Sequence, residues 1–496
     1  MGRRSFLAGF LIVLSLVGAL VFWGRREAGL PAAIPAPEAG IPFLFFEGRG
    51  ESFAVMGKAL AAREKNGAAV RSLDRLLPLL AEADDVAALF ASEHEGFSFS
   101  GVLRFDEKGT KGGGRQRTSL WEELKPVRED VSGPLPDLFE LEGPSPMFPL
   151  YFGKFKGLVL AASSPQKIWS MMQILEKGEG GMAVPWEIEK RWPNHFYLYD
   201  GGIASRLASK ILPGIKTAGL SVSGAVRFSG GGGRVKWRAE GAEDLFPGFP
   251  ADNWEPASWT GGYIALEPFI ASFGISLPPL QASFIEEHGL ARLGLNEGLG
   301  FRGADFEEIL PGPLTFSLTG RGKLLIFPAP GALFQLPDRG EAGEAFAESF
   351  WKKEWTSLVP AVEKLNGYPS GGVASIPFSI LCAANRRMLR FGVVDGDALK
   401  YGEKKTIADA VPLLKEAGRA VFWAYADGPA LARALEGLVQ IESIAGKLGR
   451  VMGMKLKTAT RITEELKKTG VLTLILSSPG EGILEWEAKP DPADCE

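Results

Sequence analysis

Three histidines are the side chains best suited to metal binding or to proton transfer near neutral pH: His94, His195 and His288. His94 stands between two glutamates, and His288 follows two others. Neither has a second ligand four residues away, which is the spacing that places two metal ligands on one helix face. We therefore expect charged, solvated helix ends at His94 and His288, and we predict no metal and no cofactor.

The serine and glycine patterns of nucleophilic or phosphate chemistry are incomplete. Segment 219–224 (GLSVSG) lacks the Gly-x-Ser-x-Gly spacing of a hydrolase. The glycine runs at 112–114 and 230–233 are not followed by Gly-Lys-Ser/Thr, so they are more typical of hairpin turns than of a phosphate loop. We name no catalytic residue. Catalytic groups can also converge from distant positions, so an envelope hydrolase with a scattered site stays an alternative.

The chain contains two cysteines, Cys382 and Cys495. Cys382 lies in an apolar, strand-like run, and Cys495 is the penultimate residue. We expect one buried thiol and one thiol on a frayed tail, with a disulfide as the alternative.

Hairpin strands recur along the chain. Segments 96–105 and 219–228 are identical at six of ten positions, and both alternate apolar and polar residues. Gly101 and Gly224 fall on their apolar faces, where a glycine marks a bulge or lets a helix pack closely.

A short apolar strand that ends in an acidic residue precedes several hairpins, and a helix-like segment follows it. We interpret the acids as helix caps rather than catalysts, because an acid at a helix start accepts hydrogen bonds from free N–H groups and meets the positive end of the helix dipole. The strands and their expected helices are 43–48 before 53–63, 196–201 before 203–212, 421–428 before 431–439 and, as a looser copy, 263–268 before 269–273.

These elements predict an α+β fold in which repeated β-α-β-β units form largely antiparallel, twisted sheets with helices on one face. A helix beginning at Pro165 and longer helices over 341–364 and 430–467 are also expected, the last of them broken near 446–453. The helix at 341–364 carries an aromatic stripe, which we interpret as a core-facing side; the alternative is a surface for a membrane or an apolar ligand. We predict two lobes, 43–258 and 259–489, and a disordered tail, 490–496.

The beginning of the chain predicts a membrane anchor. Residues 5–23 contain no charged side chain, and nineteen helical residues span about 28 Å, close to the ~30 Å hydrocarbon core of a bilayer. We assign 1–26 to the anchor and 27–42 to a Pro/Ala-rich stalk. A cleaved signal peptide is the alternative, although bulky residues at 20–23 do not suit cleavage. Arg3-Arg4 also fits a twin-arginine export signal.

The soluble body, residues 27–496, carries 51 basic and 59 acidic side chains, a net charge of −8. This balance argues against nucleic-acid binding by bulk electrostatics. We place the body outside the cytoplasm, in the periplasm, tethered to the inner or cytoplasmic membrane through residues 5–23 as a single-pass protein. An envelope protein or an apolar ligand is the expected further partner.

The anchor, the stalk and the units at 196–240 and 421–489 resemble a group of bacterial membrane-anchored envelope proteins with repeated strand–helix–hairpin units. The resemblance implies location and fold and transfers no residue roles. The predicted function is a non-catalytic binding or scaffolding protein of a bacterial envelope. The alternatives are the scattered-site hydrolase and a carrier of lipid or another apolar ligand, which an apolar cavity lined by phenylalanine would favour.

Overall fold

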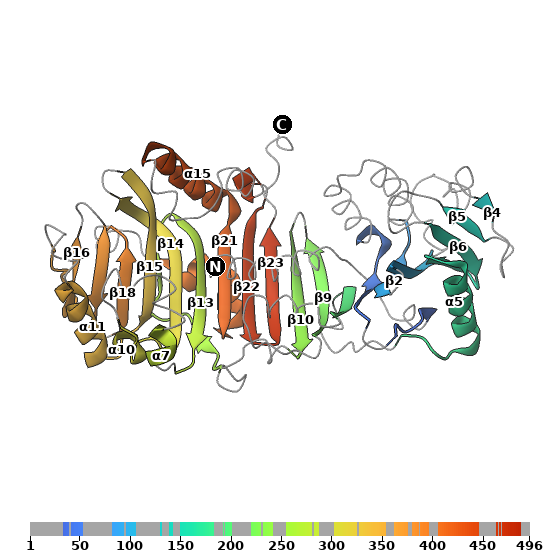
Figure 1. The fold of residues 1–496 in the computed structure, drawn as a ribbon, viewed down its shortest axis with the longest axis horizontal. Coiled ribbons are helices and arrows are strands. Elements are labelled where there is room, and N and C mark those ends of the chain that lie inside the picture. Colours follow the sequence, from blue (N-terminus) through green and yellow to red (C-terminus); the bar gives the residue numbers. More distant parts are fainter. Residues whose placement is uncertain are drawn as a thin grey trace. The chain divides into compact units, whose positions relative to one another are not determined.

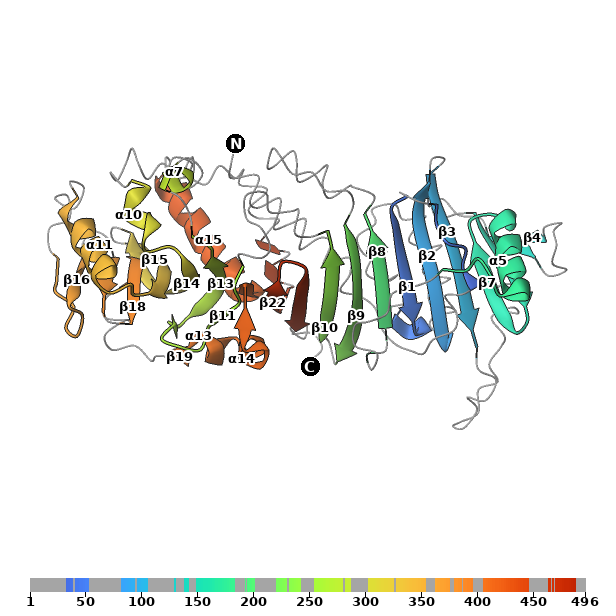
Figure 2. The ribbon, with the colours of Figure 1, turned by 90° about the horizontal axis from the view of Figure 1, so that it is seen from below.

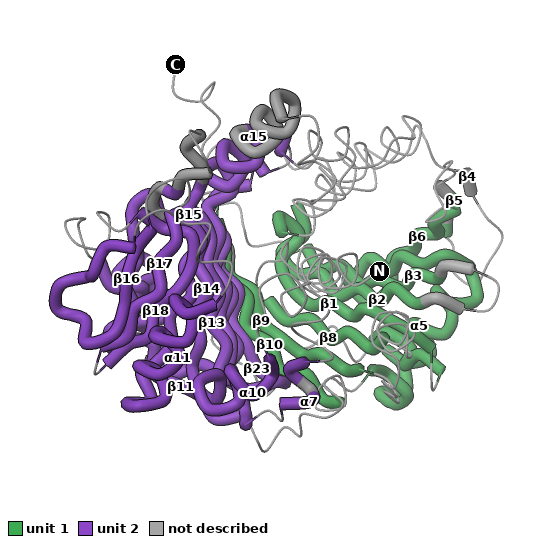
Figure 3. The backbone as a smooth tube through the Cα atoms, turned by 60° about the vertical axis from the view of Figure 1, so that its left-hand side comes forward, with its two compact units in different colours: residues 1, 3–247 green, residues 2, 248–496 purple. Residues whose placement is uncertain are grey.

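A computed structural model shows an α+β protein built mostly of antiparallel sheet, which confirms the predicted class and the predicted antiparallel pairing (Figure 1). The chain forms two compact units, residues 3–247 (unit 1) and 248–496 (unit 2), which Figure 3 colours separately. The predicted boundary between the lobes, after residue 258, lies eleven residues further along the chain. The structure describes residues 33–38, 41–52, 82–93, 96–105, 129–130, 138–141, 149–182, 192, 194–200, 220–229, 232–241, 254–279, 282–286, 302–324, 327–353, 362–374, 379–385, 387–395, 405–445, 463–464, 466–467 and 469–487.

Unit 1 contains an antiparallel sheet and one long described helix. Its elements are β1 (Phe43–Gly48), β2 (Asp85–Glu93), β3 (Gly96–Arg104), β4 (Glu129–Asp130), β5 (Phe139–Leu141), β6 (Leu150–Phe155), β7 (Leu158–Ala162), α5 (Pro165–Lys177), β8 (Asn194–Tyr199), β9 (Ser221–Ser229) and β10 (Gly232–Glu240). The strand order is β10-β9-β8-β1-β2-β3-β7-β6-β5-β4.

Unit 2 has a second antiparallel sheet. Its elements are β11 (Ala257–Ser258), β12 (Ile264–Ala265), β13 (Phe269–Leu277), α7 (Ala282–Phe284), α10 (Ala304–Glu307), β14 (Gly312–Leu324), β15 (Phe327–Pro337), α11 (Glu341–Lys352), β16 (Ser370–Ala374), β17 (Ile380–Ala384), β18 (Met388–Val393), β19 (Lys405–Thr406), α13 (Ile407–Ala410), α14 (Pro412–Ala417), β20 (Arg419–Ala420), β21 (Phe422–Asp427), α15 (Gly428–Ala445), β22 (Val471–Ser478) and β23 (Glu481–Glu487). The main order is β23-β22-β21-β13-β14-β15-β18-β17-β16, and two small pairs, β11–β20 and β12–β19, stand apart.

The two main sheets have the same strand order when their strands are matched along the chain. In each unit the first strand lies between the next strand and a C-terminal meander: β1 lies between β2 and β8, and β13 lies between β14 and β21. The meanders are β8-β9-β10 and β21-β22-β23. The segments predicted as copies, 196–240 and 421–489, therefore occupy equivalent places. The helix predicted at 203–212 lies outside the described residues, as does that at 53–63.

The prediction that 263–273 form a looser fourth copy of the strand and helix was wrong. Residues 269–273 form the beginning of strand β13 rather than a helix, and the preceding segment lies in the small β12–β19 pair. The sequence from Ser272 to Leu277 alternates small or polar residues with large apolar ones, and a period of two is typical of a strand. The acid there, Glu267, pairs with Lys405 (3.2 Å) instead of capping a helix.

The other acids confirm the capping interpretation in one case. The Ala430 N–H donates to Asp427 Oδ1 (2.8 Å) in the first turn of α15. Asp200 accepts a hydrogen bond from the Leu220 N–H (2.7 Å), and the helix that it was expected to cap, 203–212, lies outside the described residues. Glu47 is buried at the end of β1.

Helix α5 confirms the helix predicted from Pro165. Ser164 caps its start, Pro165 lies in its first turn and Gly178 ends it in the left-handed conformation. Its Ile168 and Met171 are fully buried against β-strand residues of unit 1.

One other helix prediction needs correction. The helix expected over 341–364 ends at Lys352, where Lys353 is extended, and Glu363 forms a bridge with Val373. The first part of the broken helix expected over 430–467 is α15 (Gly428–Ala445), and residues 446–462, which include the expected break, lie outside the described residues.

Helices cover both faces of the unit 2 sheet, which corrects the prediction of helices on one face. Helix α11 packs on the face that carries Leu336, Cys382 and Leu389. The opposite face, with Trp423 and Ile475, is covered by α13 and α14. Figure 2 shows α7, α10, α11 and α15 on one side of this sheet and α13 and α14 on the other.

Glycines at the apolar positions make room for aromatic rings rather than for bulges or helices. A Cβ at Gly224 would lie 2.3 Å from the ring of Phe196, its partner across β8 and β9. A Cβ at Gly101 would lie 2.8 Å from the ring of Phe99. Unit 2 repeats the arrangement with Gly274 and Trp423, where the distance would be 2.1 Å.

Candidate functional site

A row of five phenylalanines crosses the side of the unit 2 sheet on which α11 and α15 pack, one from each of five adjacent strands. We call it the phenylalanine ladder: Phe422 (β21), Phe273 (β13), Phe316 (β14), Phe334 (β15) and Phe391 (β18). Successive ring centroids are 6.4, 5.5, 4.8 and 5.0 Å apart, within the range of favourable aromatic pairs. The ladder therefore forms a continuous apolar track across the strands.

The register of the sheet produces this alignment. Phe316 is directly opposite Phe273 and Phe334, and Phe334 is opposite Phe391. Phe422 pairs with the residue two positions beyond Phe273, so it lies on the same face. We call this the ladder face, and the opposite side the covered face.

The ladder rings are half-buried, whereas the polar residues that alternate with them are buried more completely. Thr315, Ser317 and Gln335 are 0% exposed, and Arg390 is 5% exposed. Both faces of this sheet are covered, so the contrast is one of degree: the ladder rings keep some exposure that the polar residues beside them lack.

Two helices border the ladder. At one end, Phe346 of α11 contacts Phe391 (5.7 Å between centroids) and also contacts Phe306 of α10 (5.3 Å). Helix α15 packs on β13, β15 and β21 on the same side (Figure 2). The aromatic stripe predicted on 341–364 thus contributes buried Phe346 and Phe350 to the core, as its core-facing interpretation requires.

On the covered face Gln335, Thr319 and Arg390 bind the backbone of the segment 259–268, which crosses the sheet, whereas Ser317 forms a hydrogen bond with Ser272 (2.8 Å) within the sheet. Gln335 accepts from the Ile264 N–H (3.0 Å) and donates to its carbonyl (2.8 Å). Thr319 donates to the Leu266 carbonyl. These contacts explain the buried polar residues as satisfied supports for the crossing segment.

Arg390 is the buried cation of this face. Its guanidinium donates to Gln335 Oε1 (3.2 Å), to the Tyr368 hydroxyl (3.1 Å) and to the Gly262 carbonyl (2.6 Å). Burial lowers the pKa of Arg390, and the nearby Tyr368 raises it. The Arg390 guanidinium thus holds three neutral oxygen atoms in place beside the crossing segment, and its role is structural.

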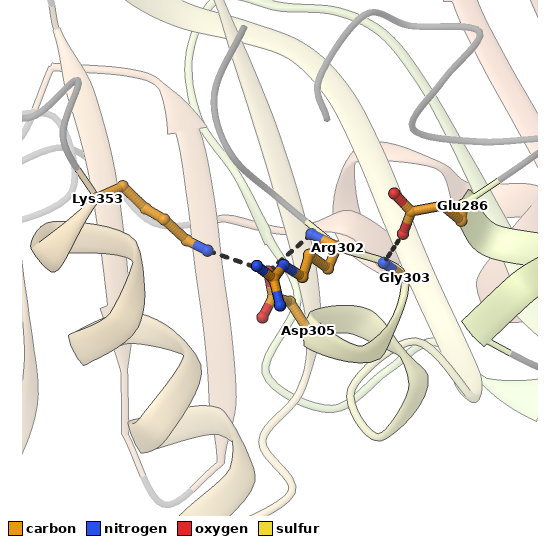
Figure 4. Close-up of polar contacts among 5 residues, drawn as sticks. All are labelled: Glu286, Arg302, Gly303, Asp305 and Lys353. Carbon is orange, nitrogen blue, oxygen red and sulfur yellow. Dashed lines mark hydrogen bonds and ion pairs between the residues drawn. The ribbon is translucent and has the colours of Figure 1, made fainter. Parts of the chain in front are cut away.

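A polar cluster joins the short helices next to α11 (Figure 4). Asp305 Oδ2 accepts from the Arg302 N–H (2.9 Å) and from Lys353 Nζ (3.1 Å), and Glu286 accepts from the Gly303 N–H. These contacts tie α10 to the end of α11. The cluster joins backbone and side chains in a structural role and offers no nucleophile.

The described histidine and cysteine that the sequence analysis considered for chemistry do not lie together in one site. His195 lies half-buried on β8, whereas His94, His288 and Cys495 lie outside the described residues. Cys382 is a buried free thiol on β17, as predicted, and burial raises its pKa. Within the described part of the chain no group of three or more His, Cys, Asp or Glu could hold a metal ion.

The ladder was not singled out from the sequence. Its rings stand one to a strand at positions up to 149 residues apart, from 273 to 422, so only the sheet register brings them together. The local signal was present in the alternation of Phe with Ser, Thr or Gln along 272–277, 314–319 and 333–336.

The predicted anchor also falls outside the described residues. In the described part no helix has both the length and the apolar character needed to cross a membrane. The stalk is described only in part, from Ala33 to Glu38 and from Ile41 onward.

Comparison with family models and with curated proteins gives no match. Among solved structures, "Structure of crystal form I of TP0453" is similar at 8% identity over 43% of this chain and 79% of that one, with a TM-score of 0.26. A likeness at this score carries no argument about fold or function.

Proposed function

We propose that the chain is a membrane-tethered, extracytoplasmic, non-catalytic binding protein of a bacterial envelope, and that the ladder face of unit 2 binds an acyl chain. The carrier interpretation is favoured over a pure scaffold by one observation: the half-buried ladder opposite a fully buried polar face. The shared strand order of the two units supports their origin as copies of one unit.

The dimensions of the ladder suit an acyl chain. Five adjacent strands span four gaps of about 4.8 Å, or roughly 19 Å. One leaflet of a bilayer is about 15 Å of hydrocarbon, half of the ~30 Å core. An extended acyl chain therefore matches the track in length, and aromatic rings offer it apolar contact without a charged group that would have to be desolvated.

Lipid retention tests the proposal. The full chain would be purified, and bound lipid measured by mass spectrometry for the wild type, for Phe316→Ser and for the control Val362→Ser, an apolar residue that is 44% exposed away from the ladder. We expect Phe316→Ser to lower retention by about ten-fold, since losing roughly 1.4 kcal/mol of apolar contact has that effect. Equal retention by the two variants would refute the assignment.

A further inference from the structure

The chain enters unit 1 directly against helix α5. Ala33 is 1% exposed and Ile34 is 0% exposed, and both belong to the same apolar cluster as Ile168 and Met171 of α5. The Met182 N–H donates to the Ile34 carbonyl (2.9 Å). Residues 33–34 of the predicted stalk are thus packed into the core of unit 1.

This entry point limits the distance between α5 and the proposed anchor. From Trp23, the last residue of the predicted span, to Ala33 there are ten residues, which reach at most about 35 Å when fully extended. Prolines in the stalk do not lengthen that reach. Helix α5, with thirteen residues, is about 20 Å long. The tether therefore keeps Ala33, and the α5 residues in the same apolar cluster, within reach of the surface that holds the anchor.

The outward face of α5 has the chemistry of a membrane interface. Trp169 is 53% exposed, more than any other large apolar side chain for which the structure gives an exposure. Its neighbours Gln166, Ser170 and Gln173 are uncharged, the first turn contains no acid, and the exposed Glu176 and Lys177 lie on this face only in the last turn. Tryptophan prefers the headgroup region, because its ring is apolar and its N–H can still bond to water or lipid.

We propose that α5 of unit 1 rests on the bilayer that holds residues 5–23, with Trp169 inserted at headgroup level. The contact rests on the tether of the proposed function and is independent of the ladder. Glu176 and Lys177 give this face no net charge, so the contact requires no anionic lipid and depends only weakly on salt. The helix would restrain how unit 1 is oriented on the membrane.

A depth measurement on the full chain tests this contact. In a Cys495→Ser background, Trp169→Cys would be labelled with an environment-sensitive fluorophore, since Cys382 is 0% exposed and protected from labelling. The protein would be reconstituted into phosphatidylcholine vesicles with and without spin-labelled lipid. Val362→Cys in unit 2, also exposed, is the matched control, and thermal unfolding would confirm that both variants fold.

We expect lipid quenching at position 169 to exceed that at position 362 by at least about two-fold, as interfacial insertion requires. If the chain floats with the vesicles and position 169 is not quenched, the contact is wrong while the tether stands. If position 169 is shielded from aqueous iodide but is not quenched by spin-labelled lipid, the proposed membrane contact is also wrong, because protein rather than lipid would then cover α5. If the chain does not float with vesicles, the tether itself fails.

Discussion

The two faces of the unit 2 sheet are made by the same strands and yet differ in what covers them. The covered face contains small polar residues and Arg390, and the segment 259–268 accepts hydrogen bonds from Gln335 and Arg390 and donates one to Gln335. The ladder face contains phenylalanine rings that remain partly exposed. Burial here follows from which segment crosses the sheet rather than from the hydrophobicity of each residue. We therefore expect the covered face to carry stability, and we propose the ladder face for binding.

Adjacent residues of β15 give the largest expected contrast. Gln335→Leu removes two hydrogen bonds to Ile264 and one from Arg390, leaving buried groups unpaired, and should lower the free energy of unfolding by about 3 kcal/mol. Phe334→Leu, its neighbour on the ladder face, should cost less than about 1.5 kcal/mol. Chemical denaturation measures both values, and equal losses would remove the distinction between the faces.

The glycine–aromatic pairs should give the next largest effect, and in both units. Gly274→Ala and Gly224→Ala force a Cβ against the rings of Trp423 and Phe196, and each should destabilise by about 2 kcal/mol through overpacking. Gly261→Ala is the control, because a Cβ there meets no atom within 4 Å. Thermal unfolding of the three variants would settle whether these pairs are close-packed; a neutral Gly274→Ala would contradict the account.

The polar cluster beside α11 should contribute little. Lys353→Met removes the contact with Asp305, and a partly exposed ion pair is worth up to about 1 kcal/mol. The difference in unfolding free energy between wild type and variant should shrink at high salt. A loss as large as that of Gln335→Leu would mean that this cluster, rather than the covered face, holds the unit together.

The smallest effect on stability is expected at α13, which packs on the covered face. The Thr406 hydroxyl, and then Lys415, lower the pKa of Asp409. A lowered pKa adds stability above the ordinary carboxyl range, near pH ~4, and that stability disappears as the pH falls through the lowered value. Asp409→Asn should therefore melt slightly earlier at neutral pH and converge with wild type in acid, as pH-dependent thermal unfolding would show; a difference that grows in acid would reverse the sign.

Local patterns predicted the antiparallel α+β class, the hairpins and helix α5, because caps, glycine turns and alternation depend on neighbouring residues. Residues 269–273 were assigned to a helix by analogy with the other acid-ended strands, although their continuation to Leu277 alternates as a strand does. The ladder could not be predicted, because it depends on the register of strands that are distant in sequence. Which face is accessible is decided by a further segment, 259–268, whose path no local pattern encodes.

The most direct test of the acyl-chain site is to map where a lipid binds. A photoactivatable sixteen-carbon fatty acid, of length comparable to the roughly 19 Å ladder, would be crosslinked to the full chain and the labelled peptides identified by mass spectrometry. We predict labels concentrated in 269–277, 312–337, 388–393 and 422–427, and their loss in Phe316→Ser. Labelling spread evenly over the surface, or absent from these strands, would contradict a ligand on the ladder face.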